Sequence, residues 1–175
     1  MADVMALSTT TFFIRPEHEA FLRAFADVLS NDDGIDGYYS SKDGGVSLAG
    51  DVDDGFTLLC WGVLDGTPRM PAAAFEALLN EHEAYREAFE DVSSFDGDEP
   101  VEIGEVLQAA LEPDTHVILR CYTAAGAYEY YSVTIYHADG DSSYETLPDI
   151  EARLRAARGV SEVEAKAVKA ARAKR

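Results

Sequence analysis

The sequence predicts a single α+β domain: a mostly antiparallel sheet of about four to six strands, helices packed on it, and a basic C-terminal helical extension. Three observations lead to this prediction. The 175 residues are the usual length of one domain. The hydrophobic fraction of 47% is ample for a core. Short β-prone runs and longer segments of helical periodicity are separated by turns rich in Asp and Gly.

The N-terminal third predicts two strands around a helix and a long irregular segment. A β-prone Phe-Phe-Ile run predicts a strand over residues 9–15, and a proline followed by apolar residues at helical spacing predicts a helix over 16–30. Residues 31–54 are rich in Asp, Gly and Ser, which favours loops around one or two short strands. Residues 56–64 are apolar at consecutive positions, which is typical of a central strand.

The remaining elements alternate between helix and strand. Apolar residues at every third or fourth position predict a long helix over 71–92 with an acidic opposite face, and a shorter helix over 101–112. Residues 116–123 and 127–137 predict a β-hairpin, and a short strand is expected over 144–147. One or two helices are expected from there to the end of the chain.

Charge divides the chain into two parts. The chain has 33 acidic and 14 basic residues, a formal net charge of −19. Residues 1–150 hold 30 of the acids and only 6 of the bases, whereas residues 151–175 hold 8 bases and 3 acids. We therefore expect an acidic α+β domain over 1–150 and a basic, alanine-rich helix or tail over 151–175. The acidic body is not suited to binding nucleic acid or an anionic membrane directly, although the tail alone offers a weak, salt-sensitive contact.

Motifs that would identify an enzyme, a cofactor or a targeting segment are absent from the sequence. It contains no glycine-rich phosphate loop, nucleophile elbow or HExxH motif, and we expect a non-enzymatic protein without a cofactor. No apolar run has the length of a membrane span and the first residues contain no basic cluster, so we expect a cytoplasmic protein. Cys60 and Cys121 lie in apolar runs and are interpreted as buried free thiols.

The Asp-Gly clusters raise the question of a calcium site. Asp32, Asp36, Gly37 and Asp43 stand at positions one, five, six and twelve of a loop, as in an EF-hand. Gly34 at position three and the Asp at position twelve do not match, and no second helix begins after the loop. Turns that use Asp and Gly for backbone reasons account for these clusters, and we assign no metal site.

The acidic face of the predicted 71–92 helix is the best candidate for a partner-binding site. Its carboxylates are spaced by one to two turns and have no interleaved lysines, so they do not stabilise the helix and present a phosphate-like surface to a basic partner. An ordinary solvated helix face is the simpler alternative. The first set of contact residues is Glu76, Glu83, Glu87, Glu90 and Asp91; a second set in loops is Asp51, Asp53, Asp54, Asp96, Asp98 and Glu99.

Tyrosines form a second cluster, in the predicted 127–137 strand. Tyr128, Tyr130 and Tyr136 share one parity, and Tyr131 belongs to the other, so one face of the strand belongs to the core. Core packing accounts for most of these tyrosines, and a partly open face would suit a protein interface.

These features favour a non-enzymatic protein that occupies a basic, nucleic-acid-binding surface of another protein. In size and charge, though not in any alignable motif, the chain resembles the acidic DNA-mimic inhibitors of phages and plasmids that act against restriction or CRISPR systems. The partner implied is a basic nucleic-acid-handling protein or complex. Two alternatives remain open: a salt-adapted acidic domain of other function, and an enzyme or metal-binding protein with an unrecognised site.

Overall fold

The computed structural model describes residues 4–31, 45–63, 69–92, 99–125, 128–146, 148–153 and 155–156. The chain divides into two compact units, one over residues 1–144 and the other over 145–175. The first unit has the predicted α+β architecture. The basic residues 157–175 lie outside the described part.

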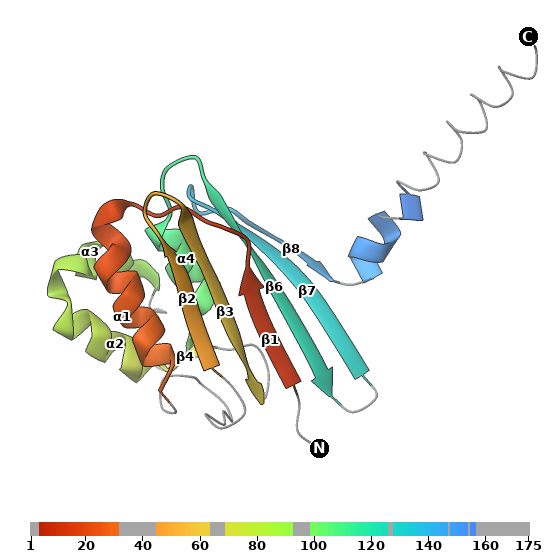
Figure 1. The fold of residues 1–175 in the computed structure, drawn as a ribbon, viewed down its shortest axis with the longest axis horizontal. Helices are drawn as coiled ribbons and strands as arrows, with labels where there is room; N and C mark the ends of the chain where they lie inside the picture. Colours follow the sequence, from red (N-terminus) through yellow and green to blue (C-terminus); the bar gives the residue numbers. More distant parts are fainter. Residues whose placement is uncertain are drawn as a thin grey trace, which may run out of the picture. The chain divides into compact units, whose positions relative to one another are not determined.

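A six-stranded antiparallel sheet forms the centre of the fold, in the order β2-β3-β1-β6-β7-β8 (Figure 1). Two hairpins, β2–β3 and β6–β7, lie on either side of the N-terminal strand β1, which is antiparallel to both β3 and β6. The strands are β1 Val4–Thr9, β2 Gly45–Asp51, β3 Gly55–Val63, β6 His116–Ala125, β7 Tyr128–His137 and β8 Ser142–Thr146.

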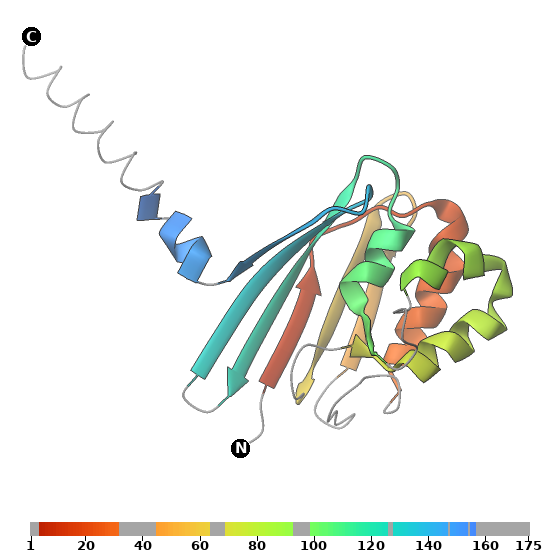
Figure 2. The same ribbon diagram turned by 180° about the vertical axis from the view of Figure 1, so that it is seen from behind.

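The helices cover one face of this sheet. In Figure 2, α4 lies in front of the strands, and in the reverse view of Figure 1 the strands lie in front of α4. A two-stranded ladder, β4 with β5, accompanies the helical layer. The elements of this layer are η1 Pro16–His18, α1 Glu19–Leu29, β4 Arg69–Met70, α2 Ala72–Glu81, η3 Glu83–Tyr85, α3 Arg86–Phe89, η4 Glu90–Val92, β5 Val101–Glu102 and α4 Ile103–Ala110.

The first strand is earlier in the chain than the sequence predicts. The predicted strand over 9–15 is wrong, because β1 ends at Thr9 and only isolated bridges follow, at Phe12 to Phe56 and Ile14 to Leu111. Thr9 accepts a hydrogen bond at Oγ1 from Leu58 N at 2.9 Å, which extends the β1–β3 contact through a side chain. The β-prone phenylalanine run therefore crosses from the sheet to the helices rather than pairing as a regular strand.

Side chains alternate across the sheet between the core and an outer surface. Leu7 on β1 is paired with Cys60 on β3 and with Cys121 on β6, and all three side chains are buried under the helices. The predicted strand over 56–64 is confirmed as β3, but only one of its faces is buried. Leu59 and Trp61 on its other face are 42% and 40% exposed.

Other predicted elements differ mainly in their boundaries. The 16–30 helix, the strand containing Val46 and Leu48, the β6–β7 hairpin and the strand β8 all form. The predicted 101–112 helix is shorter, because its first two residues pair with β4 before α4 begins at Ile103. The calcium-like loop of residues 32–43 lies outside the described residues.

The second unit is described only at its start. Residues 148–153 and 155–156 are helical, and Asp149 Oδ2 accepts hydrogen bonds from the backbone N–H and the hydroxyl of Thr146. These hydrogen bonds lower the pKa of Asp149. Arg153 pairs with Glu145, and Arg155 pairs with Glu151. Across the described ranges, the structure contains no helix with the length and apolar character of a membrane span.

The burial of the two cysteines yields the first prediction. Burial raises the pKa of Cys60 to about 12, and the electrostatic effect of Cys121 adds to the rise. Burial likewise raises the pKa of Cys121 to about 11, and the negative charge of Glu102 adds to it. Because only thiolates react quickly, we expect neither thiol of the folded protein to react with a disulfide reagent at mildly alkaline pH. Both should react at once in denaturant. Rapid reaction of a thiol in the folded protein would contradict this arrangement.

Candidate functional site

The acidic residues of the first predicted set belong to a segment that is not one straight helix. The predicted 71–92 helix is wrong in this respect, because α2 stops at Glu81 and His82 has φ −123° and ψ 51°. A 3-10 turn, the short α3 and another 3-10 turn follow. Carboxylates on the two sides of His82 therefore do not form one helical row, and Glu76 is separated from Glu83.

An aromatic cluster holds the bent segment against α1. The rings of Phe21 and Phe89 are stacked with centroids 4.2 Å apart, and His18 meets the Phe89 ring edge-on at 5.1 Å. Tyr85 and His82 also contact Phe21. Phe89 is fully buried, so it fixes α3 against α1 and leaves the polar side chains of the segment facing solvent.

A base, Arg86, lies among these acids, although the segment contains no lysine. Arg86 Nη2 donates hydrogen bonds to Glu76 Oε1 at 3.0 Å and to Asn80 Oδ1 at 2.7 Å. The hydrogen bond to Glu76 raises the pKa of Arg86. Desolvation lowers this pKa by less, and the negative charges of Glu76, Glu83 and Glu90 raise it further. Arg86 thus pairs with Glu76 and joins the two halves of the bent segment, so one carboxylate oxygen of Glu76 is engaged within the chain.

Four members of the first set remain exposed along the segment after the bend: Glu83, Glu87, Glu90 and Asp91. Glu83, Glu87 and Asp91 follow one another at intervals of four residues, and all three are exposed. Within the described part of the chain, none of the three makes a side-chain hydrogen bond or ion pair. Glu90 is also exposed, and it interacts with other residues. We call Glu83, Glu87 and Asp91 the acidic ridge.

The acidic ridge ends at a pocket that sequence analysis did not anticipate. The pocket has a volume of about 420 Å³, and Asp91, Glu105 and Asp139 contribute carboxylates to its lining. Gln108, also in the lining, donates hydrogen bonds through Nε2 to His137 O and Asp141 O, which fixes the β7–β8 turn beside α4. Among the described residues that line this pocket there is no Lys or Arg. We call it the carboxylate pocket.

Residues of the carboxylate pocket come from three parts of the chain, which explains why sequence reasoning missed two of them. Asp91 belongs to η4, Glu105 to α4, and Asp139 to the turn after β7. Glu105 lies 14 residues after Asp91 in the sequence, and Asp139 lies a further 34 residues on. Their convergence depends on tertiary packing, and no spacing in the sequence indicates it.

The second predicted set lies elsewhere. Asp51, at the end of β2, accepts hydrogen bonds at Oδ1 from the backbone N–H groups of Asp53 and Asp54 at 2.9 and 2.8 Å. These acids therefore shape the β2–β3 turn, as the backbone explanation of the Asp-Gly clusters predicts. Glu99 is exposed just before β5. Asp96 and Asp98 lie outside the described residues.

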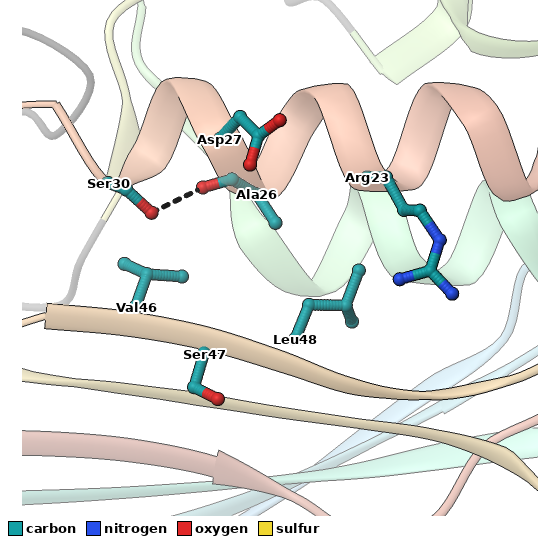
Figure 3. A pocket seen from close by; sticks show the side chains of 7 residues that line it. All are labelled: Arg23, Ala26, Asp27, Ser30, Val46, Ser47 and Leu48. Atoms are coloured by element: carbon teal, nitrogen blue, oxygen red, sulfur yellow. Dashed lines mark hydrogen bonds between the residues drawn. The ribbon is translucent and has the colours of Figure 1, made fainter.

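A second pocket lies between α1 and β2 (Figure 3). Its volume is about 360 Å³, and Arg23 is the base in its lining. The Arg23 guanidinium donates two hydrogen bonds to Glu19 Oε1 and one to Gly50 O, and it lies 5.3 Å from the centre of the Phe56 ring. Arg23 is thus occupied by structural contacts. Ser30 likewise donates its hydroxyl to Ala26 O (Figure 3).

The shifted pKa values in the core favour uncharged side chains. Burial raises the pKa of Glu102, against the opposing effect of Arg69, and Glu105 adds to the rise. Burial raises the pKa of Tyr136 to about 12, and the negative charges of Glu102 and Glu105 add to the rise. Together with the raised pKa of Cys121, these shifts are opposite to those that activate a nucleophile. Among the described residues, no group of three or more metal-ligating side chains is placed to hold an ion.

Comparison with known proteins adds no relative. No family model, curated protein or solved structure matches the chain.

The aromatic anchor of the acidic ridge can be tested by truncation. Replacing Phe89 with Ala removes a fully buried ring that contacts Phe21 and His18, and we expect a loss of about 3–5 kcal/mol in the free energy of unfolding. Urea denaturation measures this. Phe13→Ala is the matched control, because Phe13 is 38% exposed and its loss should cost much less. Equal losses would show that Phe89 does not hold the segment.

Glu102 gives a prediction on pH dependence. Its pKa is higher in the folded than in the unfolded state, so the ionised carboxylate destabilises the fold. That cost is absent below the unfolded-state pKa and becomes complete as the pH rises through the folded-state pKa. Glu102→Gln should therefore raise the melting temperature at neutral pH, and the gain should vanish at acidic pH. Glu99→Gln, at an exposed position, controls for the change in net charge; an equal gain in both variants would contradict the assignment.

Proposed function

We propose that this protein is a non-enzymatic acidic binding protein that occupies a basic, nucleic-acid-binding surface of another protein, in the manner of a DNA-mimic inhibitor. The observation that carries the proposal is the carboxylate pocket at the end of the acidic ridge. Asp91, Glu105 and Asp139 line a cavity, no base stands among its described lining residues, and this arrangement suits the insertion of a Lys or Arg side chain from a partner.

The acidic ridge supports the same proposal. Glu83, Glu87 and Asp91 are exposed on an anchored segment, and among the described residues none of the three forms an ion pair, although the charge of Arg86 lies near Glu83. Fixed negative charge accelerates association with a cationic surface and favours cationic over neutral partners. A protein that normally holds nucleic-acid phosphates offers such a surface, because phosphate binding depends on Lys and Arg.

The proposed site of action is the cytoplasm, where a phage or plasmid inhibitor of restriction or CRISPR complexes would meet its target. The two cysteines are free and buried, which is compatible with a reducing compartment. The proposal involves no cofactor.

Charge reversal on the acidic ridge tests the proposal. The double variant Glu83→Lys/Glu87→Lys should lower affinity for the partner at least about tenfold, because each reversal replaces an attraction with a repulsion. Partners are first captured from host lysate on the immobilised protein at low and moderate salt and identified by mass spectrometry. The affinity of each variant is then measured by direct titration with the captured protein. Affinity should fall as salt rises.

Glu17→Lys/Asp27→Lys is the matched control. Both residues are exposed, they lie on η1 and α1, and their reversal changes the net charge by the same amount. We expect this variant to retain most of its affinity. If both variants bind equally well, the acidic ridge is not the contact surface. If the immobilised protein captures only a diffuse set of basic proteins, its charge is a general surface property and the proposed function is wrong.

A further inference from the structure

The face of the sheet that points away from the helices carries aromatic and aliphatic side chains. The strand registers place these outward residues in rows that cross the strands β2, β3, β1, β6 and β7. We call this surface the open face. One row consists of Gly45, Trp61, Ala6, Tyr122 and Tyr131, and the next consists of Ser47, Leu59, Ser8, Arg120 and Val133.

The centre of the open face combines bulky and small side chains. Trp61 is 40% exposed and Leu59 is 42% exposed, although both lie inside the sheet rather than at its edge. A Cβ atom on Gly45 would lie 2.9 Å from Trp61 Cζ2, so the indole ring lies against the bare backbone of the neighbouring strand. On the central strand, Ala6 and Ser8 are small. Trp, Tyr and Arg are the residue types that dominate binding energy at protein interfaces, and all three occur here.

The open face is almost uncharged, in contrast to the rest of the acidic domain. Among the described outward positions of these five strands, the formal charges are Arg120, Glu129 and, at the β2–β3 turn, Asp51. The segment from η3 to η4, which carries the acidic ridge, and α4, which contributes Glu105 to the carboxylate pocket, belong to the helical layer on the other side of the sheet (Figure 2). A basic partner finds its complementary charge there and not on the open face.

We propose that the open face is the interface of a homodimer, in which a second copy of this chain packs sheet against sheet. Two chains of net charge −19 repel each other, and they approach most easily through a surface that carries little of that charge. An exposed apolar surface of this kind on a soluble domain marks an interaction site. A two-fold axis in the plane of the contact sets the open face of one copy against the open face of the other, so the contact closes and needs no second surface.

The size of the open face agrees with a dimer. The width of the face follows from five strands spaced about 4.8 Å apart. Its length lies between the six residues of β1 and the ten of β6, at about 3.4 Å per residue, so the area is on the order of 600 Å². A standard interface buries roughly 800 Å² on each partner, measured over the contours of the side chains. The face is thus large enough to form most of such an interface.

The test measures the mass of the full chain and the environment of its single tryptophan. Sedimentation equilibrium over a wide range of protein concentration should show a dimer that dissociates on dilution. Because Trp61 lies in the interface, its emission should shift to shorter wavelength on association and acrylamide should quench it less. Added salt should tighten the dimer by screening repulsion. Binding to a basic partner has the opposite salt dependence.

Two pairs of variants locate the contact. Leu59→Lys and Arg120→Glu change exposed positions on the open face and should each raise the dimer dissociation constant at least about tenfold. Ala77→Lys on α2 and Arg15→Glu just before η1 make the same changes in charge at exposed positions away from the open face. These two variants should leave the dimer dissociation constant nearly unchanged. Circular dichroism confirms that each variant is folded.

The outcomes separate cleanly. A dimer that is lost only in the open-face variants supports the proposal. A dimer that survives Leu59→Lys and Arg120→Glu uses another surface and overturns it, as does a monomer at every concentration and salt. A monomer with a shielded Trp61 would show that another part of the same chain covers the face. None of these results depends on the partner-binding assay, because the open-face variants leave the acidic ridge and the carboxylate pocket intact.

Discussion

The placement of β1 between two hairpins is the constraint on which the rest of the structure depends. This strand pairs on one edge with β3 and on the other with β6, so the β2–β3 and β6–β7 hairpins form one sheet only through its backbone. A shift of one residue in β1 would turn Leu7 outward and Ala6 inward. The same register therefore decides which side chains meet the helices and which form the open face.

The sheet divides the molecule into two surfaces of different chemistry, and this bears on the origin of the acidic charge. The side with the helices carries the acidic ridge and the carboxylate pocket, whereas the outward positions of the five strands are nearly neutral. Adaptation to high salt acts on all exposed surface and would place acids on both sides. Among the described residues the unequal distribution of charge is consistent with the two proposed interfaces, one electrostatic and one apolar.

Local patterns in the sequence predicted elements whose periodicity agrees with their packing, and they failed where tertiary contacts decided the structure. The alternation around Val46 and Leu48 and the β6–β7 hairpin were predicted because their patterns are local.

The strand β1 was missed because a stronger β-prone run follows it. The bend at His82 was missed because the apolar residues keep their helical spacing through it, so the local pattern gives no sign of the break. Among the site residues, Glu83, Glu87 and Asp91 could be chosen from spacing, but Glu105 and Asp139 converge with Asp91 only after folding.

The two proposed interfaces are thermodynamically linked because both involve the same net charge. A basic partner bound to the acidic ridge neutralises part of the charge that keeps two copies apart, and so it favours dimerisation through the open face. By reciprocity, a dimer binds the partner more tightly than a monomer does, by the same factor. The dimer also presents two acidic ridges, so a partner with two basic sites would gain further affinity through effective concentration. Because salt strengthens one contact and weakens the other, this coupling should be greatest at low ionic strength, where repulsion between free copies is largest.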